Sequence, residues 1–185
     1  MLPIAESVGA TLVDLNVLRN PALSGCASIW GPQLGKMECL QNIHLGHCSV
    51  QGTDIEPIAV ALSGVSTLIN LYLRMNLGLG GCAEMWALHL RGMRHLKKVD
   101  LQDCSLTGKD VEPIAVALSD IQTLVHLDLS DNEALGDCAS LWALHLKKMN
   151  HLEKLRLDNC DLTDRDLEPI AESVSDMPTL THLYL

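Results

Sequence analysis

The sequence has no phenylalanine, and its aromatic residues are limited to three tryptophans and two tyrosines. A hydrophobic core must therefore be built mainly from Leu, Ile, Val, Ala and Met. No stretch reaches the roughly 18 uninterrupted apolar residues that a transmembrane helix requires, so we expect no membrane-spanning segment. Basic residues are also few, with 13 Lys and Arg against 23 Asp and Glu, which gives a net charge of −10. This balance disfavours binding to nucleic acid and to anionic lipid.

Common catalytic and metal-binding motifs are missing as well. The chain contains no G-x-S-x-G, no G-x-x-x-x-G-K and no H-E-x-x-H, and no C-x-x-C pair suited to zinc. We therefore predict a protein that is not an enzyme and that needs no cofactor. Its 48% apolar and 19% charged residues are typical of a globular chain.

Leucine recurs at a fixed interval along the whole chain. Copies of the motif L-x-x-L-x-L, in which Ile or Val replaces Leu at some positions, follow one another at a constant spacing and begin at Leu12, Leu40, Leu68, Leu96, Leu124, Leu152 and Leu180. A second period, twice as long, is superimposed on the first, and it relates Trp30, Trp86 and Trp142. The repeats therefore alternate between two types, one resembling LGGCAEMWALHL (79–90) and the other DVEPIAVALS (110–119) in its second half.

Each repeat combines two kinds of hydrophobic spacing. The end of L-x-x-L-x-L alternates apolar and polar residues, as a strand with one buried face does. The second half has helical spacing, with Ile114, Ala115 and Leu118 on one face and Pro113 near the helix start. One strand and one helix cannot bury these faces alone, whereas stacked repeats can. We predict a single solenoid over residues 1–185, built from seven 28-residue βα repeats with a parallel inner sheet and outer helices, and with incomplete first and last repeats.

The pattern L-x-x-L-x-L-x-x-N/C-x-L, repeated at this period, resembles the ribonuclease-inhibitor class of leucine-rich repeats. The Cys-containing type, as in LDNCDLTDRDLEPIAESV (157–174), resembles the repeats of NLR-type intracellular immune sensors. This resemblance covers the whole chain and implies an α/β horseshoe. It also implies a protein-binding scaffold, with an innate-immune role like that of NLR proteins or a role like that of ribonuclease inhibitor.

The seven cysteines fit a reducing compartment. Cys48, Cys104 and Cys160 fall on every second repeat, so roughly 9.6 Å separates them along a parallel sheet, beyond the reach of a disulfide. The same spacing separates Cys26, Cys82 and Cys138. We expect all six thiols to be reduced, buried and bonded to turns, which together with the absence of cysteine-rich end caps predicts a cytoplasmic protein.

The non-core strand positions should form the concave surface. One row consists of Asn16, His44, Tyr72, Asp100, Asp128, Arg156 and Tyr184, and a parallel row consists of Asp14, Asn42, Asn70, Lys98, His126, Lys154 and His182. These positions vary while the surrounding scaffold repeats, as a recognition surface would. The alternative is an ordinary solvated polar face. We predict a protein ligand here, bound by His44, Asn70, Tyr72, Lys98, Asp100, His126, Asp128, Lys154, Arg156, His182 and Tyr184.

One cluster on this surface supports a different hypothesis. Asp100 and Asp128 should face each other on adjacent strands about 5 Å apart, with His126 nearby. Such a pair could bind a divalent metal ion or act as a weak metal-dependent hydrolase of phosphoesters. The competing interpretation is that Lys98, Lys154 and Arg156 neutralise the two aspartates.

The edges and ends of the solenoid give two further expectations. Basic residues gather where strands begin, whereas acidic residues, including Asp110, Asp137 and Asp166, gather where strands end. At the C-terminus, Leu180, Leu183 and Leu185 should expose apolar surface, so we also predict a weak homodimer through a terminal repeat.

Overall fold

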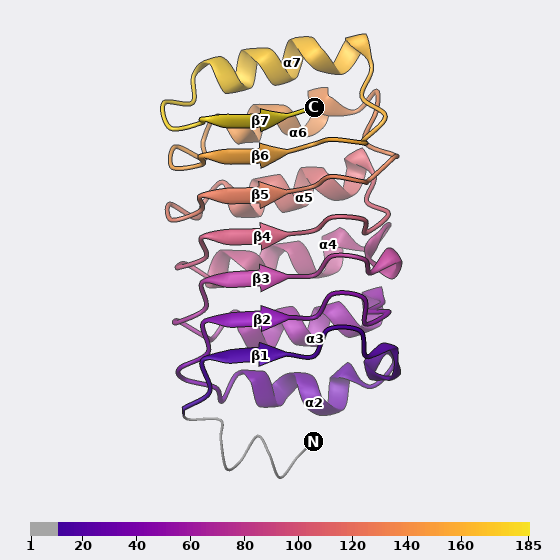
Figure 1. Ribbon diagram of the computed structural model, residues 1–185, viewed down its shortest axis with the longest axis vertical. Coiled ribbons are helices and arrows are strands. Elements are labelled where there is room, and N and C mark those ends of the chain that lie inside the picture. The colour runs from indigo at the N-terminus through magenta and orange to yellow at the C-terminus, as the bar shows by residue number, and fades with distance from the viewer. Residues whose placement is uncertain (1–10) are drawn as a thin grey trace.

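The protein forms one parallel seven-stranded sheet whose strands follow one another in chain order (Figure 1). The computed structural model describes residues 11–185. The strands are β1 (Asp14–Asn16), β2 (Asn42–His44), β3 (Asn70–Tyr72), β4 (Lys98–Asp100), β5 (His126–Asp128), β6 (Lys154–Arg156) and β7 (His182–Tyr184). The predicted seven-stranded α/β horseshoe is therefore confirmed. Most of the predicted incomplete first repeat, which precedes Leu12, lies outside the described residues.

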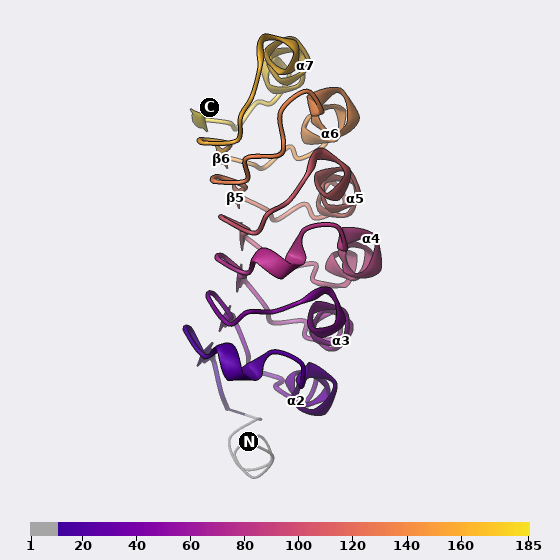
Figure 2. The ribbon, with the colours of Figure 1, turned by 90° about the vertical axis from the view of Figure 1, so that its right-hand side faces the viewer.

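A helical segment connects each strand to the next. The α-helices are α2 (Ala27–Leu34), α3 (Gly52–Leu62), α4 (Ala83–Trp86), α5 (Gly108–Leu118), α6 (Ala139–Leu146) and α7 (Asp164–Ser175). Three short 3-10 helices accompany them: η1 (Pro21–Leu23), η2 (Leu77–Leu79) and η3 (Ala87–Gly92). The helices form one layer on the outer, convex side of a gentle arc, and the strands line the inner side (Figure 2).

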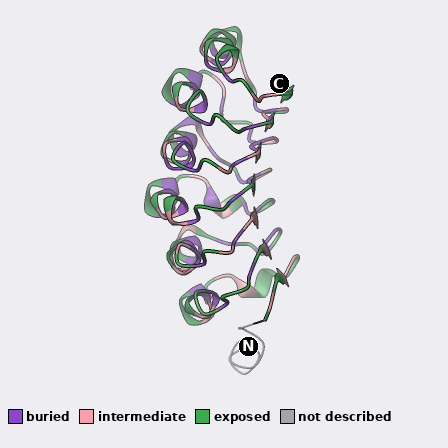
Figure 3. Cartoon of the chain, turned by 90° about the vertical axis from the view of Figure 1, so that its left-hand side faces the viewer, coloured by how far each residue is buried: buried purple, intermediate pink, exposed green. Residues whose placement is uncertain are grey.

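The core lies between these two layers (Figure 3). All three apolar positions of the L-x-x-L-x-L motif are buried in the repeats that begin at Leu40, Leu68, Leu96, Leu124 and Leu152. Trp86 and Trp142 are completely buried on the helical side of the core, where they supply volume that Phe would otherwise provide. In the part of the chain that the structure describes, no helix combines the length and the apolar character needed to cross a membrane.

Buried polar side chains connect each repeat to the one before it. Asn132 accepts hydrogen bonds from the backbone N–H groups of Cys104 and Leu106, at 3.0 and 2.9 Å, and donates to the carbonyl of Leu101 at 3.0 Å. Asn76 makes the equivalent hydrogen bonds two repeats earlier. These side-chain amides bond backbone N–H and C=O groups of the turns that have no partner in a strand or helix. Such backbone groups are costly when they are buried without a hydrogen bond.

The cysteines follow the sequence prediction only in part. Cys48, Cys104 and Cys160 are buried free thiols, and the Cys104 thiol donates to the Leu73 carbonyl of the preceding repeat at 3.3 Å. Burial raises the pKa of Cys104 to about 12, so this group stays a neutral thiol. The expectation of full burial is wrong for the helix cysteines Cys26, Cys82 and Cys138. They are half-buried, because each stands at the N-cap of a helix near the surface.

Candidate functional site

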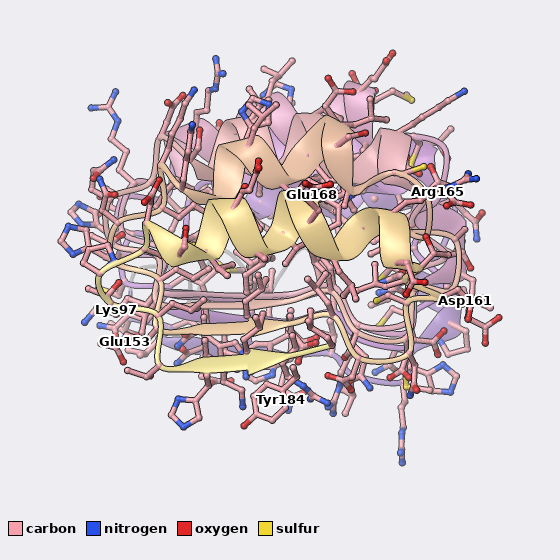
Figure 4. All side chains as sticks on the ribbon, turned by 90° about the horizontal axis from the view of Figure 1, so that it is seen from above. Lys97, Glu153, Asp161, Arg165, Glu168 and Tyr184 are labelled. Carbon is pink, nitrogen blue, oxygen red and sulfur yellow. The ribbon has the colours of Figure 1, made fainter. Side chains whose placement is uncertain are left out.

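The two predicted rows lie on the concave face in the register that the repeat period requires. Each strand residue pairs with its equivalent in the next repeat, so that Asn16 begins one continuous row and Tyr184 ends it. Viewed along the solenoid, Tyr184 projects from β7 away from the helical layer (Figure 4). The second row runs parallel to the first, and within it the Asn70 amide donates to Asn42 Oδ1 at 2.6 Å. The concave face is therefore a polar sheet surface with two tyrosines, Tyr72 and Tyr184.

The first aromatic position forms an ordered cluster with residues from both neighbouring strands. The His44 and Tyr72 rings stack with centroids 4.3 Å apart and an interplanar angle of 6°. Lys98 Nζ lies 5.0 Å from the centroid of the Tyr72 ring. Burial, and then the charges of Asp100 and Asp14, raise the pKa of Tyr72, which keeps its phenol protonated as a hydrogen-bond donor. We call His44, Tyr72 and Lys98 the N-terminal aromatic cluster.

The second aromatic position repeats this chemistry four strands further along. Lys154 Nζ lies 5.1 Å from the Tyr184 ring centroid, and the Arg156 guanidinium carbon lies 5.7 Å from it. The rings of His182 and Tyr184 are nearly parallel, with centroids 6.5 Å apart. We call Lys154, Arg156, His182 and Tyr184 the C-terminal aromatic cluster. Both clusters hold a tyrosine in a fixed orientation beside a cation, which lowers the conformational entropy lost when a partner binds.

The two central aspartates separate these clusters. Asp100 and Asp128 occupy paired positions on β4 and β5, as predicted, but both are buried and not exposed to a ligand. Asp128 accepts a hydrogen bond from the Ser130 hydroxyl at 2.6 Å and forms an ion pair with Arg156 at 3.3 Å. Arg156 also binds Asp158 at 2.7 Å. The predicted neutralisation by Arg156 is confirmed for Asp128.

Asp100 has a weaker set of partners. Its Oδ1 atom accepts the backbone N–H of Gln102 at 3.3 Å. Burial raises the pKa of Asp100, and the charge of Asp128 raises it further. The hydrogen bond from Gln102 and the charge of Lys98 lower the pKa and offset part of this rise. The carboxyl of Asp100 is thus more readily protonated than an ordinary aspartate side chain.

His126 lies in the second row between Lys98 and Lys154. Its Nε2 atom is buried, and no partner within the described part of the chain hydrogen-bonds it. Burial, and then the charges of Lys98 and Lys154, lower the pKa of His126 to about 4, so the ring is neutral at neutral pH. A buried nitrogen without a hydrogen-bond partner is costly, so His126 contributes strain to this face and not an accessible acceptor.

These contacts give the metal hypothesis no support. Across residues 11–185, no group of three or more His, Cys, Asp or Glu side chains is arranged to hold a metal ion. Asp128 already forms an ion pair with Arg156. The neighbouring Asp131 accepts hydrogen bonds from Gln102 at 2.7 Å and from Asn159 at 2.9 Å. A hydrolase based on Asp100 and Asp128 would have to displace these partners.

The predicted acidic edge is wrong for two of its aspartates. Asp110 and Asp166 are buried at the starts of α5 and α7, where they accept backbone hydrogen bonds. Asp166 Oδ1 accepts the N–H of Ala139, the first residue of α6, at 2.9 Å. Asp161 and Arg165 both lie on the side of the molecule where the strands end (Figure 4), and Arg165 Nη1 lies 3.8 Å from Asp137 Oδ1. The other predicted aspartates of this edge, including Asp137 and Asp161, are not buried, so the edge remains largely acidic.

Comparisons with known proteins agree with this architecture. Residues 92–115, 121–137 and 148–171 match the family model described as leucine rich repeat. The chain is 33% identical over 153 residues to ribonuclease inhibitor of Sus scrofa, which covers 77% of this chain and 32% of the inhibitor. It is 30% identical over 152 residues to NACHT, LRR and PYD domains-containing protein 5 of Mus musculus, which covers 80% of this chain and 13% of that protein.

A solved structure shows the same fold. An internalin of Listeria monocytogenes superposes with a TM-score of 0.65 over 95% of this chain and 42% of its own, at 20% identity. The chain spans less than a third of the length of either curated relative named above.

Proposed function

We propose that this chain, which belongs to the leucine-rich repeat proteins of the ribonuclease-inhibitor-like and NLR-like type, is a protein-binding scaffold that binds its partner through the concave face. The observation that carries this proposal is the pair of aromatic clusters around Tyr72 and Tyr184. The scaffold around them repeats residue by residue, whereas these positions differ from strand to strand. Tyrosine and arginine are the side chains most often found at the energetic centres of protein interfaces.

The chemistry of the concave face suggests the character of the partner. Each cluster offers a tyrosine ring beside one or two cations. A protein surface that presents acidic or carbonyl groups near apolar side chains would complement these features. The mechanism is recognition without chemistry, in the cytoplasm, with either an innate-immune role or inhibition of a ribonuclease.

Affinity capture with matched variants tests this proposal. Wild-type chain, Tyr72→Ala and Tyr184→Ala serve as bait in parallel with Leu77→Ala, an exposed leucine outside the concave rows. We expect one or more proteins to be retained by the wild type and by Leu77→Ala, and to lose about ten-fold or more in affinity with each tyrosine variant. Equal retention by all four baits would place the binding surface elsewhere.

A direct assay separates the two roles that the relatives suggest. Ribonuclease activity is measured with increasing amounts of the chain, using wild type and Tyr184→Ala. Inhibition that weakens in the variant supports the inhibitor-like role, and absence of inhibition removes it while leaving recognition by the concave face intact.

A further inference from the structure

Two lysines on the concave face have no acidic partner. Lys98 of β4 and Lys154 of β6 are partly buried in the second row, with His126 of β5 paired between them. Within residues 11–185, neither ammonium group forms an ion pair or a hydrogen bond. We call Lys98 and Lys154 the lysine pair. A cation that lacks an internal counterion is free to bind an external one.

The tyrosines of the two aromatic clusters hold the lysine pair apart. Lys98 Nζ lies 5.0 Å from the ring centroid of Tyr72 on β3, and Lys154 Nζ lies 5.1 Å from that of Tyr184 on β7. Each ammonium group therefore leans toward a strand on the far side from β5. Because β5 lies midway between the two tyrosine strands, the surface above it is bordered by a cation on each side.

Cations determine the local potential above β5. The charged groups that face His126 come from three strands, and they are Lys98 and Asp100 on β4, Asp128 on β5, and Lys154 and Arg156 on β6. Burial, and then the charges of Lys98 and Lys154, lower the pKa of His126 to about 4. Asp128 opposes this shift, and Arg156 adds to it. An anion placed above β5 would therefore meet a favourable local field, although the whole chain carries a net charge of −10.

We propose that the lysine pair binds an aspartate or glutamate side chain of the protein partner above β5. This inference rests on the proposed function, since it assigns one contact within the concave face. Neighbouring strands are about 4.8 Å apart, and the flexible four-carbon stem of lysine lets each ammonium group cross that distance. A carboxylate has two oxygens, so it can accept hydrogen bonds from both lysines at once. Tyr72 and Tyr184 then border the bound acid on either side.

A carboxylate suits this surface better than a phosphate does. Phosphate is commonly bound through the paired N–H groups of an arginine. Arg156, on the same strand as Lys154, already donates to Asp158 from Nε at 3.0 Å and from Nη2 at 2.7 Å. Its Nη1 atom lies 3.3 Å from Asp128 Oδ2, so its whole fork is engaged and the lysine pair remains as two point charges. The nearby carboxylates of Asp128 and Asp158 would also repel a doubly charged phosphate more strongly than a singly charged carboxylate.

NMR titration with an acetylated hexaglutamate peptide at neutral pH tests this inference. We expect the signals of His126 and of the lysine pair to shift together, with a dissociation constant of about 1 mM, because exposed ion pairs are individually weak. Lys98→Gln and Lys154→Gln should each weaken binding about five-fold. The matched control Lys109→Gln alters an exposed lysine on the outer helix α5 and should leave binding unchanged. In the free chain, the first two variants should also raise the pKa of His126, because one repelling charge is lost, and this rise shows that the local structure is kept.

Two results of this titration would overturn the inference. One is a hexaglutamate peptide that shifts the signals of the lysine pair and His126 no more than an uncharged hexaglutamine peptide does. The other is a short thymidine oligonucleotide that binds as tightly as the acidic peptide and is lost with the same lysine variants. That second result would assign the lysine pair to phosphate and not to a carboxylate.

Capture of the protein partner separates this inference from the proposed function. The double variant Lys98→Gln/Lys154→Gln should retain the captured partner about twenty-fold less tightly than the wild type does. If Tyr72→Ala releases the partner and the double variant does not, the concave face binds it without the lysine pair, and this inference alone fails. If neither variant releases the partner, the proposed function fails as well.

Discussion

Asp110 offers the sharpest test of how consecutive repeats are held together. Its carboxylate accepts the backbone N–H of Thr107 at 3.0 Å, the Thr107 hydroxyl at 2.7 Å and the N–H of Ala83 at 3.3 Å. The first bond belongs to the capping box at the start of α5, and the third reaches the start of α4 in the preceding repeat. One side chain thus stabilises two helix starts.

The cost of removing this carboxylate can be estimated from its donors. The Ala83 N–H is buried and would lose its partner, at a cost of about 1–3 kcal/mol, whereas the Thr107 groups can turn to water. Loss of the N-terminal cap adds about 1 kcal/mol. Asp110→Ala should therefore lower the free energy of unfolding by about 3 kcal/mol, and Asp110→Asn by about half as much because the shape is kept.

Urea unfolding followed by circular dichroism measures these changes. Glu112→Ala is the matched control, since Glu112 is an exposed acid on the same helix and should change stability by about 0.5 kcal/mol or less. If Asp110→Ala costs no more than Glu112→Ala, the carboxylate does not connect the repeats and our reasoning fails.

The pH dependence gives a second measure of the same group. Burial opposes ionisation of Asp110, but the hydrogen bonds from Thr107, Gly81 and Ala83 outweigh it and lower the pKa of this carboxyl. The unfolded chain therefore binds the proton more readily. The stability that Asp110 contributes is complete above the ordinary carboxyl pKa and is lost as the pH falls below it. Asp110→Asn should show a smaller loss of stability on acidification than the wild type.

Three other predictions concern single side chains. Asn132→Ala should lower the free energy of unfolding by about 3 kcal/mol in the same urea assay, because three buried turn groups lose their partner. His126 should titrate near pH 4 by NMR. Because folding lowers the pKa of His126, the free energy of unfolding should fall as the pH drops from about 6.5 toward 4. The variant His126→Gln should show a smaller fall. Maleimide should label the exposed Cys39 within minutes in the native state, whereas Cys104 and Cys160 should react only on unfolding; early labelling of Cys104 by mass spectrometry would contradict its burial.

The repeat period was sufficient to predict the fold and the register of the concave face. No insertion interrupts the constant spacing, so the partner of Tyr72 on the next strand is the residue one repeat length later in the sequence, Asp100. The structure pairs these two residues. The parallel sheet follows from the same spacing, since a helix in every repeat returns the chain to the same edge.

Side-chain orientation was not predictable in the same way. The stacking of His44 on Tyr72 and the burial of Asp100 depend on rotamers and on how neighbouring rows pack. Asp110 and Asp166 looked like edge charges because the sequence places them after strands. Their burial arises because each carboxylate also caps the helix of the preceding repeat. The sequence could have indicated this only if the capping box and the start of the preceding helix had been considered together.

The buried connections between repeats all point in one direction. Asp110, Asn132 and Cys104 each bond backbone groups of the preceding repeat, so every repeat completes the hydrogen bonding of the one synthesised before it. On a ribosome, a newly emerged repeat would keep unpaired turn groups until the whole of the next repeat follows it out of the exit tunnel. The nascent chain should therefore acquire its structure one repeat behind synthesis. Shortening the chain from its C-terminal side should unpair the last remaining turn, whereas shortening it from the N-terminal side should leave every remaining turn paired.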